Sequence, residues 1–261
     1  MIEAVLVVLT NAVAGRQDDF DDWYTNIHVR DALRFRGAIA TQRFGWAAQQ
    51  VQDFPVDFGW GHLALYEVFD PARFSREHID NALTTRMKVS DAIRMDGLND
   101  YHYFPLQFRD NAPGTLHAGG VILEQIAVVA DRHEAFIAWY NDGYFSVACA
   151  RAGVRKGSRK GAFMAVLPQG QLIDAFPAHT FVATYHIDDE RPLAAWRSSR
   201  ALAECGLAED VRITCWEPVT LRITEDEVIY TSAAGLAAEE GARARMGNRV
   251  LGDRGDELKP A

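Results

Sequence analysis

The sequence lacks the motifs that most readily identify an enzyme class. It contains no glycine-rich phosphate loop of either nucleotide-binding type, no G-x-S-x-G nucleophile elbow, no H-E-x-x-H pair and no clustered Cys/His metal site. The sequence therefore gives no support to a nucleotide-dependent enzyme, an α/β-hydrolase or a zinc hydrolase. Any catalytic chemistry must come from side chains that the fold brings together.

Basic charge and long apolar runs are also scarce. The formal net charge is −9, and Arg155, Lys156, Arg159 and Lys160 are too few and too local to form a basic stripe. Nucleic acids and anionic membranes attract such stripes, so we expect no nucleic-acid partner and no membrane partner. The N-terminal run MIEAVLVVLTNAV carries Glu3 and is too short to span a bilayer. We therefore interpret it as a strand and not as an export signal.

Cysteine is rare as well. The three cysteines, Cys149, Cys205 and Cys215, form no C-x-x-C pair and leave an odd count. This pattern fits reduced thiols better than a disulfide framework. We therefore expect a cytoplasmic protein.

What the sequence does contain is an internal repeat. Residues 21–44 read DDWYTNIHVRDALRFRGAIATQRF, and a second copy, AWYNDGYFSVACARAGVRKGSRKG, occurs later in the chain. Trp23 and Tyr24 align with Trp139 and Tyr140 at a constant offset of 116 residues. A repeat that holds a helix and the following strand at this offset is longer than a solenoid unit. It indicates a duplicated half-domain.

The hydrophobic periodicity predicts the same order of elements in both halves. In the first half we expect strands at 4–10, 38–46, 62–70 and 101–108 and helices at 18–34 and 71–94. In the second half we expect strands at 124–130, 158–167, 179–187 and 211–223 and helices at 132–151 and 191–205. The order strand, helix, strand, strand, helix, strand is that of a ferredoxin-like unit. The predicted fold class is therefore α+β, with two tandem ferredoxin-like (βαββαβ) units.

The predicted domain boundaries follow from this order. The first ferredoxin-like half covers residues 1–110 and the second covers residues 120–223, with the turn-rich linker NAPGTLHAGG between them. Residues 224–261 are a C-terminal helical extension and tail, with a helix at 233–245. We expect this extension to lie on the surface of its own chain, with wrapping around a partner subunit as the alternative.

The first predicted helix and the strands near it carry the candidate catalytic residues. Tyr24 and His28 are four residues apart and share the helix face that meets the core. A histidine there could exchange a proton near neutral pH, while the phenols of Tyr24 and Tyr66 could stabilise a developing oxyanion. His62 shares the Tyr66 face of its strand and is a second candidate proton carrier. Arg43 could bind a substrate carboxylate or phenolate.

Each of these residues also has a structural interpretation. His28 could be a structural or exposed histidine, and Tyr24 and Tyr66 could be core aromatics with satisfied hydroxyls. Arg43 could be an ion-paired strand residue. Tryptophan is likewise common in cores and interfaces. A cavity that binds an aromatic substrate could nevertheless be lined by Trp46, Trp60 and Trp216.

The signature W-Y-x-N-x-H, followed by a glycine and an arginine-containing strand, resembles the EthD-like members of the dimeric α+β barrel superfamily. It is formed here by Trp23, Tyr24, Asn26, His28, Gly37 and Arg43. The resemblance spans each half, and single-unit members of the superfamily dimerise face to face through their sheets. It therefore implies a fused pseudo-dimer, an intramolecular dimeric α+β barrel with a pocket between sheet and helices in each unit. The whole chain could in addition form a homodimer, with a second copy of itself as the partner.

The resemblance also implies a range of reactions. Relatives include cofactor-free monooxygenases, polyketide cyclases, muconolactone isomerases and members without known activity, and the fold alone does not choose among them. We expect this chain to work without a cofactor. Some tandem-barrel relatives hold haem through a histidine, and His179 and His186 in the second half keep haem as an alternative.

The two copies differ at the position of the candidate base. His28 of the first copy aligns with Tyr144 of the second. We therefore expect the chemistry in the first half and a mainly structural second half. In the alternative, Tyr144 and Tyr185 bind substrate in a second pocket, because a tyrosine hydroxyl can donate a hydrogen bond or a proton.

The predicted function combines these observations. We expect a cofactor-independent lyase, isomerase or cyclase that uses His28 as general base or acid on a small aromatic or polyketide-like compound, as in the catabolism of aromatic compounds. One alternative is a cofactor-free monooxygenase of a phenolic substrate. The other is a non-catalytic binding or oligomerisation module.

Overall fold

The computed structural model describes residues 2–54, 59–82, 84, 86–110, 119–151, 159–165, 177–187, 193–197 and 201–251. Within these ranges the strands are β1 (Ala4–Ala12), β2 (Ala38–Trp46), β3 (His62–Val68), β4 (Ile93–Asp110), β5 (Gly120–Val128), β6 (Arg159–Ala165), β7 (Phe181–Ile187), β8 (Ala208–Pro218) and β9 (Ile223–Thr224). The α-helices are α1 (Gln17–Trp23), α2 (Val29–Leu33), α3 (Pro71–Asn81), α4 (His133–Trp139), α5 (Phe145–Arg151), α6 (Leu193–Arg197), α7 (Ala201–Glu204), α8 (Glu225–Ile229) and α9 (Ala233–Met246). None of the helices in these ranges combines the length and apolar character needed to cross a lipid bilayer.

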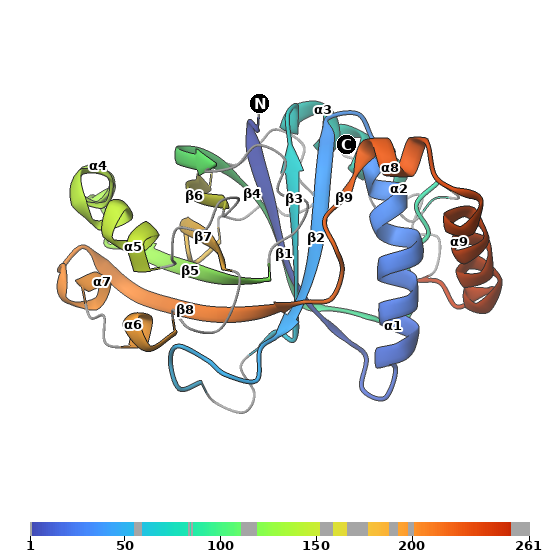
Figure 1. The fold of residues 1–261 in the computed structure, drawn as a ribbon, viewed down its shortest axis with the longest axis horizontal. Helices are drawn as coiled ribbons and strands as arrows, with labels where there is room; N and C mark the ends of the chain where they lie inside the picture. Colours follow the sequence, from blue (N-terminus) through green and yellow to red (C-terminus); the bar gives the residue numbers. More distant parts are fainter. Residues whose placement is uncertain are drawn as a thin grey trace.

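The strands form one antiparallel sheet that closes into a barrel. Their order is β3-β1-β4-β6-β7-β5-β8-β2-β9, and an additional pairing of β3 with β2 closes every strand except β9 into a ring. The two halves of the chain meet at two seams, where β4 pairs with β6 and the end of β2 pairs with β8. The helices of the first half and those of the second lie on opposite sides of this barrel (Figure 1).

The barrel interior is filled by apolar side chains. In β1, Val5 and Val7 belong to the interior cluster, whereas Leu6 and Val8 belong to the cluster beneath the first-half helices. Both faces of the strand are buried, which explains its continuous apolar run. Both halves contribute to the interior, which contains Val5, Val7, Leu9, Phe44, Leu63, Leu65, Tyr103, Val121, Leu123, Val182 and Trp216. Because side chains occupy the inside of such a small barrel, candidate sites lie on its outer faces, beneath the helices.

A π-helical turn interrupts the first helix of each half at the same point. The turn η1 covers Tyr24–His28, and η2 covers Tyr140–Tyr144, 116 residues later. Such turns are rare and frequently occur at functional sites. The two halves therefore share a local irregularity of the backbone as well as an order of elements.

Most predicted elements agree with the observed ones to within a few residues. The exceptions in the first half are the helix predicted at 71–94, which ends at Asn81, and the strand predicted at 101–108, which is part of the longer strand β4 from Ile93 to Asp110. The side-chain amide of Asn81 donates to the backbone carbonyl of Glu77 at 2.6 Å. The backbone carbonyl of Asn81 accepts from the hydroxyl of Thr84 at 2.7 Å. These local hydrogen bonds compete with continuation of the helix. In the second half, the long helix predicted after β7 is observed as α6 and α7, and the residues between them lie outside the described ranges.

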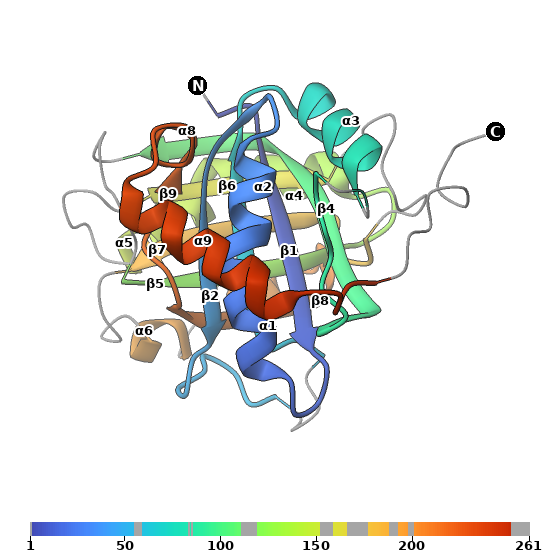
Figure 2. The same cartoon turned by 90° about the vertical axis from the view of Figure 1, so that its right-hand side faces the viewer.

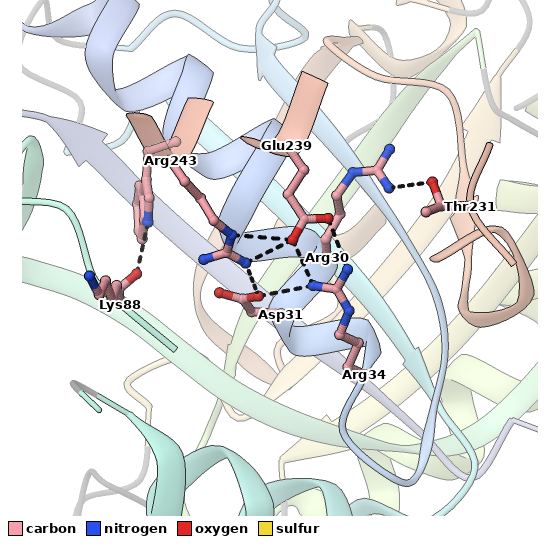
Figure 3. Close-up of polar contacts among 8 residues, drawn as sticks. Arg30, Asp31, Arg34, Lys88, Thr231, Glu239 and Arg243 are labelled. Carbon is pink, nitrogen blue, oxygen red and sulfur yellow. Dashed lines mark hydrogen bonds and ion pairs between the residues drawn. The ribbon is translucent and has the colours of Figure 1, made fainter. Parts of the chain in front are cut away.

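The C-terminal extension packs on its own chain, and the helix predicted at 233–245 is confirmed as α9. We call residues 223–251, which comprise β9, α8 and α9, the C-terminal clasp. β9 pairs with β2, and α9 crosses the helix formed by α1, η1 and α2 (Figure 2). Ion pairs fix this crossing: Asp31 contacts Arg243 at 2.5 Å, and Glu239 contacts Arg34 at 2.8 Å (Figure 3). The clasp thus holds the helix that carries Tyr24 and His28.

Candidate functional site

Tyr24, His28 and Tyr66 come together on the outer face of the first half. Tyr24 and His28 are the two ends of η1, and their rings make an edge-to-face contact with centroids 4.8 Å apart. Tyr66 comes from β3 and belongs to the same buried cluster. Trp23 supports the turn, because its ring packs on that of His28 at 4.8 Å and its indole N–H donates to the carbonyl of Lys88 at 2.9 Å. The structure therefore assembles the three residues predicted to be catalytic.

Three polar atoms of this group are buried without a hydrogen-bond partner among the described residues. They are the hydroxyl oxygens of Tyr24 and Tyr66 and Nδ1 of His28. The two hydroxyls are close enough for each to influence the pKa of the other, but they form no hydrogen bond of acceptable geometry. An unpaired buried polar group costs about 1–3 kcal/mol, and native proteins pair nearly all such groups with protein, water or ligand. These three atoms define the candidate site.

Burial sets the protonation states of the site. It raises the pKa of Tyr24 to about 12 and the pKa of Tyr66 well above 10, so both phenols remain neutral donors at physiological pH. Burial, together with the neighbouring basic groups of His78 and Arg43, lowers the pKa of His28 to about 3. The imidazole is therefore neutral. It would hold a proton well only when a negative charge forms beside it.

Arg43, predicted to bind a substrate anion, reaches the site with its guanidinium already engaged. The side chain is buried, Nη2 contacts the carboxylate of Asp21 at 2.7 Å, and Nη1 donates to the hydroxyl of Thr25. The guanidinium lies over the ring of Tyr24, with Cζ 4.4 Å from the centroid. Arg43 is thus ion-paired, which is the structural interpretation considered for it above. The positive charge of Arg43 therefore acts on the candidate site from its position over the ring of Tyr24.

Two residues that were not predicted add to the electrostatics of the site. Asp100 on β4 pairs in register with Val8, whose side chain faces the helices, so Asp100 projects to the same face. Burial raises the pKa of Asp100, and its charge raises the pKa of both Tyr24 and Tyr66. On α3, burial lowers the pKa of His78. The prediction missed Asp100 because it placed the start of this strand at residue 101.

His62 lies on the Tyr66 face of β3, as the alternation predicted, but beside the group and not within it. Its ring packs on Phe20 at 4.7 Å, and Phe20 in turn contacts Tyr24 at 5.4 Å. The Nε2 atom of His62 contacts the side-chain amide of Gln17 at 3.0 Å. Burial, together with the nearby positive charge of Arg43, lowers the pKa of His62 to about 4.

The equivalent face of the second half holds a closed hydrogen-bond network. Glu124 on β5 is fully buried and accepts hydrogen bonds from Tyr140 and Tyr144 at 2.7 Å each and from Tyr185 at 3.1 Å. The hydroxyls of Tyr140 and Tyr185 are also 2.5 Å apart. Burial raises the pKa of Glu124 to about 7, although these hydrogen bonds and the charge of Arg151 oppose the shift. Every hydroxyl of this group has a partner, in contrast to the first half.

Tyr144 and Tyr185, predicted as substrate-binding residues of a second pocket, therefore bind a carboxylate of the chain itself. The prediction missed Glu124, which stands where the first repeat has Val8. The available signal was a charged residue in the middle of the apolar strand VILEQIAVV. A charge in a strand buried on both faces requires a partner, and the tyrosines of the following helix supply it.

A separate cleft of about 1470 Å³ opens at one end of the barrel. Trp46, predicted to bind substrate, lines this cleft together with Phe54 and Trp60 and does not lie beside His28. Trp216 is buried in the barrel interior, in edge-to-face contact with Trp46 at 5.3 Å. The described residues that line the cleft include no histidine. We therefore place the candidate site at the first-half cluster.

The second half shows no fit for haem among its described residues. The outer face beneath η2 is occupied by the tyrosine network, and the imidazole of His179 contacts Asp210 at 2.9 Å. His186 lies on the opposite face of β7 from Tyr185, away from the helices. The described residues also contain no group of three or more His, Cys, Asp or Glu side chains arranged to hold a metal ion.

Comparison with known proteins identifies the fold. No protein-family model and no curated protein matches the chain. A proposed monooxygenase from Fusobacterium nucleatum subsp. nucleatum superposes with a TM-score of 0.57 at 8% identity, over 85% of this chain and 94% of that one. An anthrone oxidase-like protein gives 0.56 at 12% identity, over 88% and 96%. A chlorite dismutase variant from Candidatus Nitrospira defluvii gives 0.51 at 10% identity, over 87% and 94%. At these identities the likeness concerns the fold alone, and the chain has the α+β fold of the dimeric α+β barrel proteins.

Proposed function

We propose that the chain is a cofactor-independent acid–base enzyme that acts on a small aromatic or polyketide-like compound in the first-half site. The observation that carries this proposal is that Tyr24, which contacts His28 and lies beside Tyr66, belongs to a buried group in which two phenol hydroxyls and one imidazole nitrogen have no hydrogen-bond partner among the described residues. A substrate hydroxyl or carbonyl oxygen placed among them would complete their hydrogen bonds. The surrounding apolar cluster would accept the ring of an aromatic compound.

The protonation states favour a reaction that creates a negative charge. His28 is neutral and can accept a proton from a phenol or from an acidic C–H group of the substrate. Tyr24 and Tyr66 keep their protons and can donate hydrogen bonds to the oxyanion that results. The imidazolium and the oxyanion then stabilise each other in a site that disfavours either charge alone. Return of the proton to a different atom would complete an isomerisation, a cyclisation or an elimination.

A second candidate reaction is the monooxygenation of a phenolic substrate without a cofactor. The structural neighbours described as a proposed monooxygenase and as anthrone oxidase-like favour it. It begins with the same deprotonation by His28. At an activated methylene group, the carbanion would then react with dioxygen, one oxygen atom forming the product carbonyl and the other leaving as water. The two reactions differ in whether oxygen is consumed.

The experiment compares the purified protein with a His28→Gln variant, using anthrone and 1-naphthol as probes. Oxygen uptake and the ultraviolet spectrum of each probe are recorded together. We expect His28→Gln to lose about 10²-fold or more in turnover while its melting temperature stays close to that of the parent. His133→Gln, a histidine of the second half, is the matched control and should keep full turnover. Equal turnover of parent and His28→Gln would contradict the proposal.

We further propose that the two halves are duplicated ferredoxin-like units of the EthD-like kind. Support comes from the matched turns η1 and η2 and from the aligned pairs Trp23-Tyr24 and Trp139-Tyr140. The two seams β4–β6 and β2–β8 would then correspond to the interface of a dimer of single units. In this proposal the second copy replaced a catalytic histidine with a structural tyrosine.

A further inference from the structure

The second half contains two buried N–H donors that have no acceptor within the described part of the chain. They are Nη1 of Arg151, the last residue of α5, and Nε1 of Trp196 on α6. Trp196 is only 1% exposed, and Arg151 is partly buried. Neither atom has a hydrogen-bond partner among the described residues. Buried donors of this kind are paired in nearly all native proteins.

The two donors belong to one stack of side chains. The guanidinium carbon of Arg151 lies 5.6 Å from the ring centroid of Tyr144 and 5.9 Å from that of Trp196. The ring of Trp196 packs in turn on Tyr185 at 4.9 Å. The guanidinium therefore packs against both aromatic rings, one of which is the indole that carries the second donor. A positive charge and a further N–H donor within one group of side chains can together recognise an anion.

The first half does not repeat this arrangement. Phe35 stands 116 residues before Arg151, and its ring contacts Phe74 and His78 of α3. An aromatic ring in contact with other rings therefore stands at the position that aligns with the guanidinium of Arg151. The first half therefore has no counterpart of the Arg151 guanidinium at the aligned position.

We propose that Arg151 and Trp196 form a binding site for the carboxylate of a small aromatic acid. Two N–H donors match the two oxygens of one carboxylate, and the rings that flank the guanidinium provide an apolar edge for the rest of the ligand. The charge should be single, because the buried Glu124 lies just beyond Tyr144 and would repel a dianion when it is ionised. The site is separate from the first-half site and does not depend on the proposed function.

The test is calorimetric titration of the full-length protein with benzoate, with neutral benzamide as the matched control ligand. We expect benzoate to bind and benzamide to give no measurable heat. Trp196→Phe keeps the ring and removes the N–H, and Arg151→Met keeps much of the stem and removes the charge. Each should weaken benzoate binding about tenfold or more, whereas His28→Gln should bind benzoate as the parent does.

Three outcomes would overturn the proposal. The first is no binding of benzoate up to about 10 mM, a concentration that detects even millimolar affinities. The second is unchanged benzoate affinity in both Trp196→Phe and Arg151→Met, which would mean that the benzoate sits elsewhere. The third is tighter binding of phenyl phosphate than of benzoate at pH 8, which would show a site for dianions. If Arg151→Met fails to fold, Trp196→Phe alone decides between these outcomes, because it preserves the packing.

Discussion

His28 and Tyr144 occupy the last position of two matching π-helical turns, yet their polar atoms differ in whether they form a hydrogen bond. Nδ1 of His28 is buried with no hydrogen-bond partner among the residues that the structure describes, whereas the hydroxyl of Tyr144 donates to Glu124 at 2.7 Å. The same backbone therefore presents an unfilled polar site in one half and a completed network in the other. This difference supports locating the chemistry in the first half.

The buried carboxyl of Glu124 should make stability depend on pH. Its folded pKa is about 7, above the ordinary value of 4.5, so the folded state binds the proton more tightly than the unfolded state does. Stability from this group is therefore full below pH 4.5 and is lost as pH rises to about 7, by roughly 3 kcal/mol in order of magnitude. Glu124→Gln lacks this loss. The free energy of unfolding of the variant relative to the parent, measured in urea, should rise between pH 5 and pH 8.

The control for this prediction is an acid that is exposed and paired on the surface. Asp96→Asn, whose parent carboxylate contacts Arg94 at 2.6 Å at the exposed start of β4, should shift stability little across the same range. A constant difference between Glu124→Gln and the parent from pH 5 to pH 8 would show that Glu124 is already ionised in the folded protein at pH 5, so that burial does not raise its pKa.

Much of the fold was predictable because strands that are buried on both faces have a continuous apolar sequence. β1 and β3 show this directly, and π-helical turns occur in the structure just after both Trp23 and Trp139, the tryptophans that the sequence repeat aligned. The closure of the sheet was not predictable from these patterns. It depends on contacts between strands far apart in the chain, such as Trp46 opposite Trp216, which no local periodicity encodes.

The candidate site was predictable where residues share one element and less so where they meet across elements. The spacing of Tyr24 and His28 placed both on one helix face, although the π turn itself was not foreseen. The engagement of Arg43 with Asp21 could not be derived, because it requires the register of β2 against the helix. Glu124 could have been found by asking what satisfies a charge inside a buried strand.

The C-terminal clasp should stabilise the helix that carries the site. Arg243 contacts Asp31, whose side chain is 4% exposed, so Arg243→Met would leave a nearly buried carboxylate with Arg34 as its remaining cation. We expect a loss of about 2 kcal/mol in the free energy of unfolding. Arg245→Met is the matched control, because its partner Asp22 is more exposed and its loss should stay below about 1 kcal/mol. Equal losses in the two variants would show that burial of the pair is unimportant.

Gly37 should not tolerate a side chain. Its φ is +103°, and a Cβ atom there would overlap the carbonyl of Asp70 and crowd Phe74. We expect Gly37→Ala to cost more than about 2 kcal/mol, because backbone strain and a steric clash add. Gly15→Ala tests the strain alone, since Gly15 has a φ of +76° and no neighbouring atom within 4 Å of its Cβ position. Its cost should be about 1 kcal/mol. Urea unfolding of both variants compares the two effects, and similar costs would contradict the clash.

The hydroxyls of Tyr66 and Tyr185, at matching positions of β3 and β7, should contribute oppositely to stability. Tyr66→Phe removes a buried hydroxyl without a partner, so the free energy of unfolding should be unchanged or rise by about 1 kcal/mol. Tyr185→Phe removes a donor from Glu124 and should lower the free energy by about 1–2 kcal/mol at pH 8, where the carboxylate is ionised.

The rise in melting temperature on ligand binding should show the opposite pattern, with the larger effect in Tyr66→Phe and the smaller in Tyr185→Phe. In the proposed function the hydroxyl of Tyr66 binds a substrate oxygen, so Tyr66→Phe should reduce the rise in melting temperature produced by 1-naphthol. Tyr185→Phe should leave that rise intact, because its hydroxyl belongs to the network around Glu124. A stability loss in Tyr66→Phe as large as that in Tyr185→Phe would mean that the hydroxyl of Tyr66 is already satisfied in the free protein. The first-half site would then be part of the core and not a place for a substrate.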